Sequence, residues 1–301
     1  MKPTLIILAA GLGSRYGGLK QMDRFGPSGE TILEYSIYDA IRSGFGKVIF
    51  VIRESMEEDL RKTILKKIEN KIETVCVFQK TDDLPNGFQL PEGREKPWGT
   101  AHAILAARNK VKEPFTVINA DDFYGLDSYK VMAGYFANNN KNSKECAMVG
   151  FELHKTVTEH GTVSRGICSL NPDSFLTDVV ERTKISKKGA NIYFEENGKQ
   201  ISLTGNELVS MNFWGFQANA MEMLQHDFSV FLRDNIQKPK SEFFIPWAVN
   251  EWIKRGDSKA KVLSGKSQWF GVTYQEDKDF VRESLSDLIE AGHYPKDLWA
   301  N

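Results

Sequence analysis

The first half of the chain alternates short apolar runs with longer amphipathic segments, and this alternation constrains the fold more than any other feature. The short runs are largely apolar, as strands buried on both faces of a parallel sheet are, and they cover residues 4–8, 47–52, 73–78, 115–119 and 147–153. The longer segments carry apolar side chains at helical spacing and cover residues 32–42, 56–68, 100–109 and 128–138. The pattern predicts an α/β fold, a doubly wound and mainly parallel sheet covered by helices.

Two segments interrupt this rhythm. Residues 80–97 hold too many prolines, glycines and asparagines for a helix or a central strand, so we expect a long structured loop of the kind that often serves as a lid or binding loop. Residues 161–216 are β-like and turn-rich, with a hairpin turn expected at Asn197–Gly198. The remainder predicts helices at 242–254 and 277–291 around a strand at 261–263. No repeat or low-complexity linker separates these parts, which favours one elaborated domain over two.

Composition excludes several classes of protein. The 301 residues carry 39 Lys+Arg against 40 Asp+Glu, and this balance argues against a nucleic-acid binder, which usually has a basic excess. The longest apolar run, residues 5–10, is far shorter than the ~20 residues of a membrane-spanning helix, and we interpret it as a first strand rather than as part of a signal peptide. The three widely spaced cysteines suggest neither a disulfide framework nor a zinc site, so a reducing cytoplasm is expected: Cys76, Cys146 and Cys168.

A glycine-rich segment follows the first expected strand directly. Gly11 and Gly13 let the backbone approach a ligand closely, and successive N–H groups of such a loop bind phosphate oxygens. Two cations accompany them, Arg15 with a forked guanidinium and Lys20 with a compact ammonium. Ligands of open parallel sheets bind at the carboxyl ends of the strands, where this loop is expected.

The segment does not match two well-known phosphate loops. A Walker A loop needs lysine directly after glycine and then a hydroxyl residue, but here Leu19 precedes Lys20 and Gln21 follows it. A dinucleotide fingerprint that starts at Gly11 needs glycine where Tyr16 stands.

Two adjacent carboxylates, Asp121 and Asp122, follow the fourth expected strand. Mg²⁺ is usually held by one or two carboxylates together with phosphate oxygens, so a carboxylate beside a phosphate loop has a natural role. An Asp-Asp pair alone often caps a turn, and it is the glycine loop upstream that favours metal binding here.

The segment Leu8-Ala9-Ala10-Gly11-Leu12-Gly13-Ser14-Arg15, followed by Lys20, resembles the opening signature of the nucleotidyltransferases that activate sugar 1-phosphates. The distance from Arg15 to Lys20 is shorter than in the hexose-1-phosphate enzymes and more similar to the molybdopterin-related nucleotidyltransferases. The resemblance implies a Rossmann-like fold of the nucleotide-diphospho-sugar transferase type over residues 1–301. It implies catalytic roles for Arg15 and Lys20, with nucleotide contacts from Ala10, Gly11, Gly13 and Ser14.

The resemblance covers most of the chain and divides it into functional parts. It implies a nucleotide-binding half (1–125), a β-rich acceptor-binding half (151–276) and a C-terminal helical segment (277–301). On the nucleotide side, Gln79 matches the position that hydrogen-bonds a pyrimidine base, and Gly99 with Thr100 resembles the second nucleotide-contacting turn, although residues 80–98 form an insertion between them. Asp121 matches the metal ligand, whereas Asp122 matches a more variable neighbour.

On the acceptor side, the resemblance implies contacts from four residues. Gly161 matches the glycine that contacts the sugar, Glu181 and Asn212 match partners of sugar hydroxyls, and Arg182 stands where relatives place a cation near the acceptor phosphate. Carboxylate and amide groups suit hydroxyl partners.

One departure concerns the metal site. Related enzymes complete that site with an acid or amide in a late strand, in a pattern like Trp-x-Asp, but here the sequence is Trp269-Phe270-Gly271 and glycine offers no side-chain ligand. Glu276, Asp277 or water are the alternatives that the sequence leaves open.

The resemblance implies an enzyme of the nucleotidyltransferase class. We expect Mg²⁺-dependent transfer from a nucleoside triphosphate, a pyrimidine and most plausibly UTP, to a sugar 1-phosphate, with release of pyrophosphate. The acceptor phosphate is already ionised near neutral pH, so no protein base is needed, and catalysis reduces to positioning and charge stabilisation.

Three alternatives stay open at this point. The first is a molybdopterin-type or other small-molecule cytidylyl- or guanylyltransferase, the second a dinucleotide-dependent oxidoreductase, and the third a non-catalytic nucleotide-sugar sensor. The sequence fixes neither base, acceptor nor oligomeric state, and it favours neither a nucleic-acid nor a membrane partner.

Overall fold

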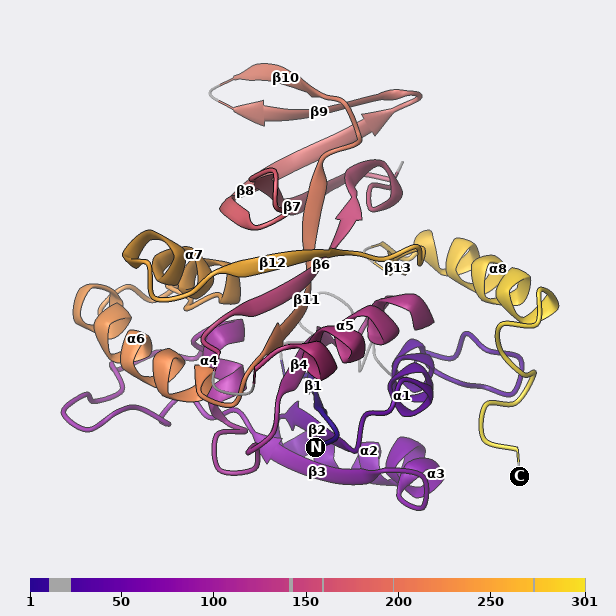
Figure 1. Ribbon diagram of the computed structural model, residues 1–301, viewed down its shortest axis with the longest axis horizontal. Coiled ribbons are helices and arrows are strands. Elements are labelled where there is room, and N and C mark those ends of the chain that lie inside the picture. Colours follow the sequence, from indigo (N-terminus) through magenta and orange to yellow (C-terminus); the bar gives the residue numbers. More distant parts are fainter. Residues whose placement is uncertain (11–22, 141–142, 159, 197, 273, 301) are drawn as a thin grey trace.

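A mixed eleven-stranded sheet runs through the molecule and carries helices on both faces (Figure 1). The computed structural model describes residues 1–10, 23–140, 143–158, 160–196, 198–272 and 274–300. The strands of this sheet are β1 (Thr4–Leu8), β2 (Lys47–Ile52), β3 (Glu73–Phe78), β4 (Phe115–Asn119), β6 (Cys146–Glu152), β7 (Thr162–Leu170), β8 (Leu176–Lys188), β9 (Asn191–Glu196), β10 (Lys199–Leu203), β11 (Leu208–Phe216) and β12 (Ala260–Ser264). A second sheet pairs only β5 (Asp122–Phe123) with β13 (Phe270–Gly271).

The helices fill most of the connections between strands. They are α1 (Ile32–Arg42), α2 (Glu57–Leu60), α3 (Lys66–Ile68), α4 (Thr100–Leu105), α5 (Leu126–Asn138), α6 (Ala220–Asn235), α7 (Ile245–Arg255) and α8 (Asp277–Glu290). A capping box starts α1, because the Thr31 side chain accepts from the Glu34 amide and Glu34 accepts from the Thr31 amide. None of these helices, within the part of the chain that the structure describes, has the length and apolar character needed to cross a membrane.

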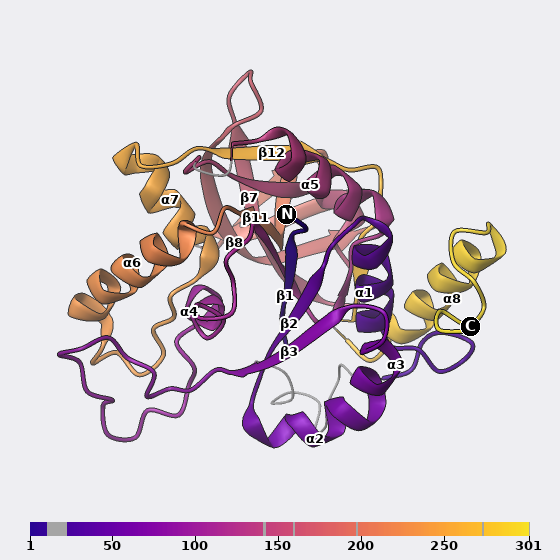
Figure 2. The same cartoon turned by 60° about the horizontal axis from the view of Figure 1, so that its bottom comes forward.

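The central strands confirm the predicted parallel sheet. β4, β1, β2 and β3 lie side by side in that order and pair in parallel, with Ile6 opposite both Ile49 and Val117. Side chains of β1 alternate between two cores: Leu5 and Ile7 pack on one face, Ile6 and Leu8 on the other. The first core faces α1 and α5, and the second faces α4, α6 and α7, which lie on opposite sides of these strands in Figure 2. Burial on both faces explains why β1, β2 and β4 are largely apolar, whereas the edge strand β3 is half-buried and begins with an exposed glutamate.

The β-rich excursion between Gly161 and Phe216 is also confirmed. Strands β7 to β10 form an antiparallel extension of the sheet, at the opposite end from β3 (Figure 1), and β11 returns to pair antiparallel with β4, β6 and β7. β9 and β10 form the expected hairpin, with Glu196 paired to Lys199; Asn197 of its turn lies outside the described residues.

The structure corrects the predicted elements in two places. Helix α6 was not predicted, although Leu224, Phe228 and Phe231 recur at helical spacing and pack in the second core. The predicted helix at 56–68 is divided by a π-helical turn over Arg61–Leu65. The predicted loop at 80–97 contains no helix or strand, and its Arg94 is anchored by hydrogen bonds to the carbonyls of Lys238 (3.0 Å) and Ser241 (2.7 Å).

A third, smaller core attaches the C-terminal segment. Phe123 of β5 stacks on Phe270 of β13 at 4.2 Å, and Val281 of α8 packs in the same cluster. Beyond α8, the Tyr294 hydroxyl donates to Asp39 (2.7 Å) and the Trp299 indole donates to Glu34 (2.8 Å), both on α1. The two-stranded sheet is therefore held between α1 and α8, next to the carboxyl end of β4.

Candidate active site

The carboxyl ends of β1 and β4 meet at one edge of the sheet. Leu8 lies opposite Asn119 in the parallel register, and the Ala120 amide donates to the Leu8 carbonyl (3.2 Å). The predicted glycine loop therefore begins, after Ala10, beside the Asp121–Asp122 pair. Five predicted loop residues lie outside the described residues: Gly11, Gly13, Ser14, Arg15 and Lys20.

Ala10 itself is buried, and a cation fixes its carbonyl. The Arg53 side chain donates through Nε to the Ala10 carbonyl (2.8 Å), and the Ala9 amide donates to the Val51 carbonyl (2.9 Å). Arg53 directly follows β2, so it stands at the same edge of the sheet as Asp121. Sequence reasoning missed it, although a basic residue directly after a strand was a usable signal.

Gln79 follows β3 and is oriented by a buried histidine. Its Nε2 lies 3.1 Å from the Gly99 carbonyl and 3.2 Å from His102 Nδ1, while His102 Nε2 lies 3.1 Å from the Asp83 carbonyl. A carbonyl only accepts, so His102 carries its proton on Nε2 and accepts from Gln79 through Nδ1; burial lowers the pKa of His102, which favours this neutral form. Both amide protons of Gln79 are thus directed at protein acceptors, which leaves Oε1 to contact a ligand.

The turn at Gly99 and Thr100 is fastened to the segment before α7. Gly99 has φ +99°, and a Cβ there would lie 2.7 Å from the Phe243 carbonyl oxygen. The Thr100 hydroxyl accepts from the Ile245 amide (3.1 Å), and the Ala101 amide donates to the Phe243 carbonyl (3.0 Å). Glycine is therefore required at position 99 by its backbone conformation and by the close approach of Phe243.

Gly99→Ala is expected to destabilise the fold much more than Gly93→Ala. Both glycines have positive φ, but the space around Gly93 is open, so its substitution adds only the conformational cost of ~1 kcal/mol. Gly99→Ala also forces the Phe243 backbone to move, for a total of about 3 kcal/mol or more. Urea unfolding of the two variants measures both values, and equal losses of stability would contradict the packing described here.

Asp122 is buried beneath the edge of the sheet. Its Oδ2 accepts from Asn119 Nδ2 (2.9 Å) and lies 3.1 Å from the Tyr124 hydroxyl, which also contacts the Met211 carbonyl at 2.8 Å. Burial and the adjacent Asp121 carboxylate raise the pKa of Asp122 above its ordinary value. Asp121 is partly exposed at the same edge. The pair therefore combines a partly exposed carboxylate with a buried one.

Asn212 joins this network from β11. It occupies a bulge between Ser210 and Trp214, where its backbone adopts φ +61°, and its Nδ2 donates to Asn119 Oδ1 (3.3 Å). A left-handed asparagine in a bulge is a feature that often re-aims a side chain at a functional site. The bulge thus brings a predicted acceptor residue next to the predicted metal site.

Arg165 on β7 supplies a positive charge that sequence reasoning missed. Its guanidinium donates to the Ser164 carbonyl (2.8 Å) and lies 5.1 Å from the centre of the Trp269 ring. Burial lowers the pKa of Arg165, and the nearby carboxylates of Asp122 and Glu181 oppose that change. Nothing in the sequence around Arg165 marks it, because only the folded sheet brings β7 toward Asp122.

The other predicted acceptor residues have described contacts with protein groups. Glu181 on β8 is partly buried, which raises its pKa while Arg165 opposes the rise. Arg182 donates to Glu196 (2.5 Å) and lies over the Phe194 ring at 4.6 Å. Gly161 is covered by the ring of Tyr274, whose hydroxyl would lie 2.6 Å from a Cβ at position 161. Glu181 therefore interacts electrostatically with Arg165, whereas the described contacts of Arg182 are with Glu196 and Phe194.

Gly271 lies opposite Asp122 in the pairing of β13 with β5. Of the two sequence alternatives nearby, Glu276 is exposed, whereas Asp277 is buried and accepts from the Thr158 hydroxyl (2.9 Å) and the Tyr274 amide (2.7 Å). The described residues contain no group of three or more His, Cys, Asp or Glu side chains arranged to hold a metal ion. A metal bound here by protein carboxylates would thus also need substrate oxygens or water.

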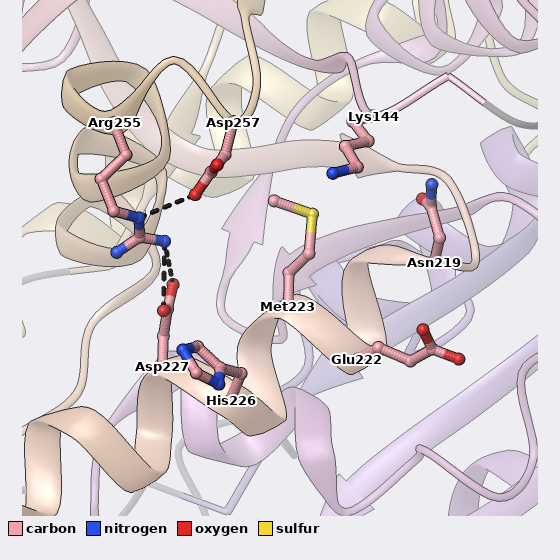
Figure 3. Close-up of a pocket in the computed structure, with 8 residues that line it drawn as sticks. All are labelled: Lys144, Asn219, Glu222, Met223, His226, Asp227, Arg255 and Asp257. Atoms are coloured by element: carbon pink, nitrogen blue, oxygen red, sulfur yellow. Dashed lines mark hydrogen bonds and ion pairs between the residues drawn. The ribbon is translucent and has the colours of Figure 1, made fainter.

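A cavity of about 310 Å³ lies elsewhere, where β6 and β12 begin (Figure 3). At its wall, Asp227 of α6 links this helix to α7 by accepting hydrogen bonds from Arg255 (3.0 Å) and from the Trp252 indole (2.5 Å). The lining residues are Lys144, Asn219, Glu222, Met223, His226, Asp227, Arg255 and Asp257. Since β6 runs parallel to β4, its first residues lie at the opposite edge from Asp121, and the cavity is separate from the candidate site.

The sequence profile of the family described as nucleotidyl transferase matches residues 4–241. A comparison with curated protein sequences gives no match.

Solved structures of similar fold share little sequence with the chain. A UDP-glucose pyrophosphorylase complexed with UDP-glucose has 19% identity and a TM-score of 0.57, with 95% of this chain and 99% of that chain covered. The inositol-1-phosphate CTP transferase from T. maritima has 14% identity and a TM-score of 0.60, with 96% of this chain and 97% of that chain covered. A putative glucose-1-phosphate thymidylyltransferase from Bacillus anthracis, in complex with a sucrose, has 12% identity and a TM-score of 0.61, with 94% and 95% covered. At these identities the likeness establishes the fold alone.

Proposed function

The chain belongs to the nucleotidyl transferase family, and we propose that it transfers a nucleotidyl group from a nucleoside triphosphate to a sugar 1-phosphate. The observation that carries this proposal is the position of Asp121 and Asp122, beside the point where the glycine loop with Arg15 and Lys20 begins. In the reaction, an oxygen of the acceptor phosphate attacks the α-phosphorus, the bond between that phosphorus and the oxygen bridging to the β-phosphate breaks, and pyrophosphate leaves. The acceptor is already an anion, so no protein group has to remove a proton.

The partly exposed carboxylate of Asp121 suits a hard divalent cation. Carboxylate oxygens are the ligands that Mg²⁺ accepts in proteins, usually with phosphate oxygens in the remaining positions. When bound, Mg²⁺ offsets the charge of the phosphates at the reacting centre. The chain's own part is to hold Asp121 at the end of β4 and to present Arg15 and Lys20 to the triphosphate.

The orientation of Gln79 supports a base that donates a hydrogen bond. Because its Nε2 protons are directed at Gly99 and His102, it would accept through Oε1, for example from N3–H of uracil or thymine. Guanine N1–H and the amino groups of guanine, adenine and cytosine are donors as well, so the choice of a pyrimidine triphosphate, with UTP first, rests on the resemblance of Gln79 to a pyrimidine-binding position. Gly99 and Thr100 stay proposed contacts of the same nucleotide.

Glu181 and Asn212 are the proposed partners of acceptor hydroxyls, Gly161 is the proposed backbone contact of the sugar, and Arg182 is the proposed cation near the acceptor phosphate. We assign residues 1–125 to nucleotide binding, 151–276 to acceptor binding and 277–301 to the C-terminal segment. The cytoplasm stays the proposed location, from the odd number and wide spacing of the three cysteines in the sequence.

Pyrophosphate release tests the proposed function. UTP, dTTP, CTP, GTP and ATP are each combined with sugar 1-phosphates, inositol phosphate and amino-alcohol phosphates in the presence of Mg²⁺. The proposal expects the highest rate with a pyrimidine triphosphate and a sugar 1-phosphate. If only a different phosphorylated compound supports release, the sugar assignment is wrong and nucleotidyl transfer alone survives.

Two rivals rest on particular sequence features. The short sequence spacing between Arg15 and Lys20 favours a molybdopterin-type or other small-molecule acceptor. Adding a pterin phosphate to the acceptors of the same assay tests this rival. Gly271 favours a non-catalytic nucleotide-sugar sensor, which would bind nucleotide sugars without pyrophosphate release under any metal.

Glu181→Ala and Asn212→Ala are expected to raise the KM for the acceptor by ~10-fold or more while leaving the KM for the triphosphate within about 2-fold. Glu181→Ala removes a proposed partner of the acceptor alone, and Asn212→Ala removes one together with the hydrogen bond to Asn119 (3.3 Å). A deoxy acceptor that lacks the contacted hydroxyl should have a much lower kcat/KM than the normal acceptor in the parent protein. In the matching variant the two acceptors should differ little in kcat/KM, because the partner of that hydroxyl is already absent. Glu195→Ala, at an exposed position of β9, is the control. Additive losses in variant and deoxy acceptor would argue against direct contact.

A further inference from the structure

The absence of a side chain at position 271 has a steric cause. A Cβ on Gly271 would lie 2.6 Å from Asp122 Oδ1, much closer than carbon and oxygen atoms approach without a bond. The Trp269 ring bounds the same space, with its nearest atom 3.0 Å from that Cβ position. The Asp122 carboxylate thus occupies the space where the Cβ atom of any side chain at position 271 would lie.

The Asp122 carboxylate is held in that position by two neighbours. Asn119 donates to Oδ2 and the Tyr124 hydroxyl lies within hydrogen-bonding distance of the same oxygen, whereas Oδ1 faces Gly271. Hydrogen bonds to one oxygen of a carboxylate are the usual way in which proteins orient a metal ligand. Asp122 is buried, with an exposed fraction of 8%, and the charge of Arg165 reaches it through space without a direct ion pair among the described residues. Its burial next to a second carboxylate, Asp121, is costly, and a cation bound to both would offset that cost.

Building on the proposed function, we infer that Asp122 supplies the second carboxylate ligand of a divalent metal site, together with Asp121. The two residues are adjacent at the carboxyl end of β4, and β13 carries glycine opposite so that the Asp122 side chain has room. The ligand class is a hard divalent cation, Mg²⁺ or Mn²⁺, because both donors are carboxylate oxygens. Asp277 already accepts from Thr158 and Tyr274, and Glu276 is exposed, so neither competes well for this role.

Binding of Mn²⁺ to the full chain tests this inference without measuring turnover. Electron paramagnetic resonance counts free Mn²⁺, and the titration is run with the metal alone and with added pyrophosphate. Asp122→Asn and Asp121→Asn are each expected to weaken Mn²⁺ binding at least ~10-fold, since loss of groups that merely orient metal ligands already costs 10- to 100-fold. Asp39→Asn is the control, because Asp39 is also a buried carboxylate but contacts Arg42 and Tyr294 instead, and its Mn²⁺ affinity should stay within about 2-fold of that of the parent protein.

A second experiment moves the carboxylate from position 122 to position 271 and measures a gain of Mn²⁺ affinity instead of a loss. Gly271→Asp alone should bind Mn²⁺ poorly, because its Cβ collides with Asp122 Oδ1. Asp122→Ala combined with Gly271→Asp removes that collision and should recover part of the affinity lost in Asp122→Ala.

The outcomes separate the inference from the proposed function. If Asp121→Asn loses Mn²⁺ while Asp122→Asn keeps parental affinity, the inference is wrong and the Asp121 site stands. If the parent protein binds no Mn²⁺ even with pyrophosphate, the inference and the metal part of the proposed function are both wrong. If Mn²⁺ binding needs both carboxylates but no acceptor supports pyrophosphate release, the metal site stands and the proposed reaction is wrong.

Discussion

Asp121→Ala is expected to lower the rate of pyrophosphate release by at least ~100-fold, and the parent enzyme is expected to lose activity to the same extent in a chelator. Asp121 stands after β4, where the first strand ends and the phosphate-binding loop is expected to begin. Without its carboxylate, the metal has too few protein oxygens to be held beside the triphosphate.

The measurement is a steady-state assay with saturating Mg²⁺ and both substrates, on protein whose thermal unfolding matches that of the parent. Asp59→Ala, at an exposed position of helix α2, is the control and should keep full activity. Full turnover of Asp121→Ala, or of the parent enzyme after thorough chelation, would show that the metal is held elsewhere or is not needed.

Arg15→Ala and Lys20→Ala are expected to reduce kcat by ~100-fold or more each, with the fold unchanged. Both cations belong to the glycine loop, and both are predicted to stabilise negative charge on the triphosphate as the α-phosphate is transferred. A preorganised charge at the reacting centre typically contributes a few kcal/mol to transition-state stabilisation, which corresponds to this change in rate.

Arg24→Ala is the matched control for these two variants, because Arg24 is an exposed arginine close to the end of the same segment. Its turnover should stay near the parental value, and single-turnover kinetics should assign the losses of Arg15→Ala and Lys20→Ala to the chemical step. Near-normal turnover in both variants would mean that the loop has a structural role only.

The sheet could be predicted from the sequence to within a residue in its central strands. β1, β2 and β4 are buried on both faces, so their sequences are largely apolar runs, and the edge strand β3 is half-buried but still rich in apolar and β-branched residues. Helix α6 was missed because it follows a β-rich segment, where the alternation that identified the other helices is interrupted. The two-stranded sheet of β5 and β13 could not be predicted either, since each strand has only two residues and the pairing joins the middle of the chain to its last part.

The position of a candidate residue at the edge of the sheet could be predicted where that residue closely follows a strand. Asp121 and Gln79 stand at strand ends, and a parallel sheet brings such positions to one edge. Arg165 was not predictable in this way, because its place near Asp122 depends on how the antiparallel extension folds back on β4. The meaning of Gly271 also needed the structure, since only the β5–β13 register reveals that the Asp122 side chain occupies the adjacent space.

Transfer of the α-phosphate is the step that defines the proposed function, and its isotopic label is the most direct test. UTP labelled at the α-phosphorus, or in parallel at the γ-phosphorus, is incubated with the enzyme, Mg²⁺ and a sugar 1-phosphate, and the products are separated. We predict that the α-label appears in a nucleoside diphosphate sugar and the γ-label in pyrophosphate, in equal amounts. Appearance of the γ-label in inorganic phosphate or in the sugar, with the α-label in a free nucleoside diphosphate, would contradict nucleotidyl transfer.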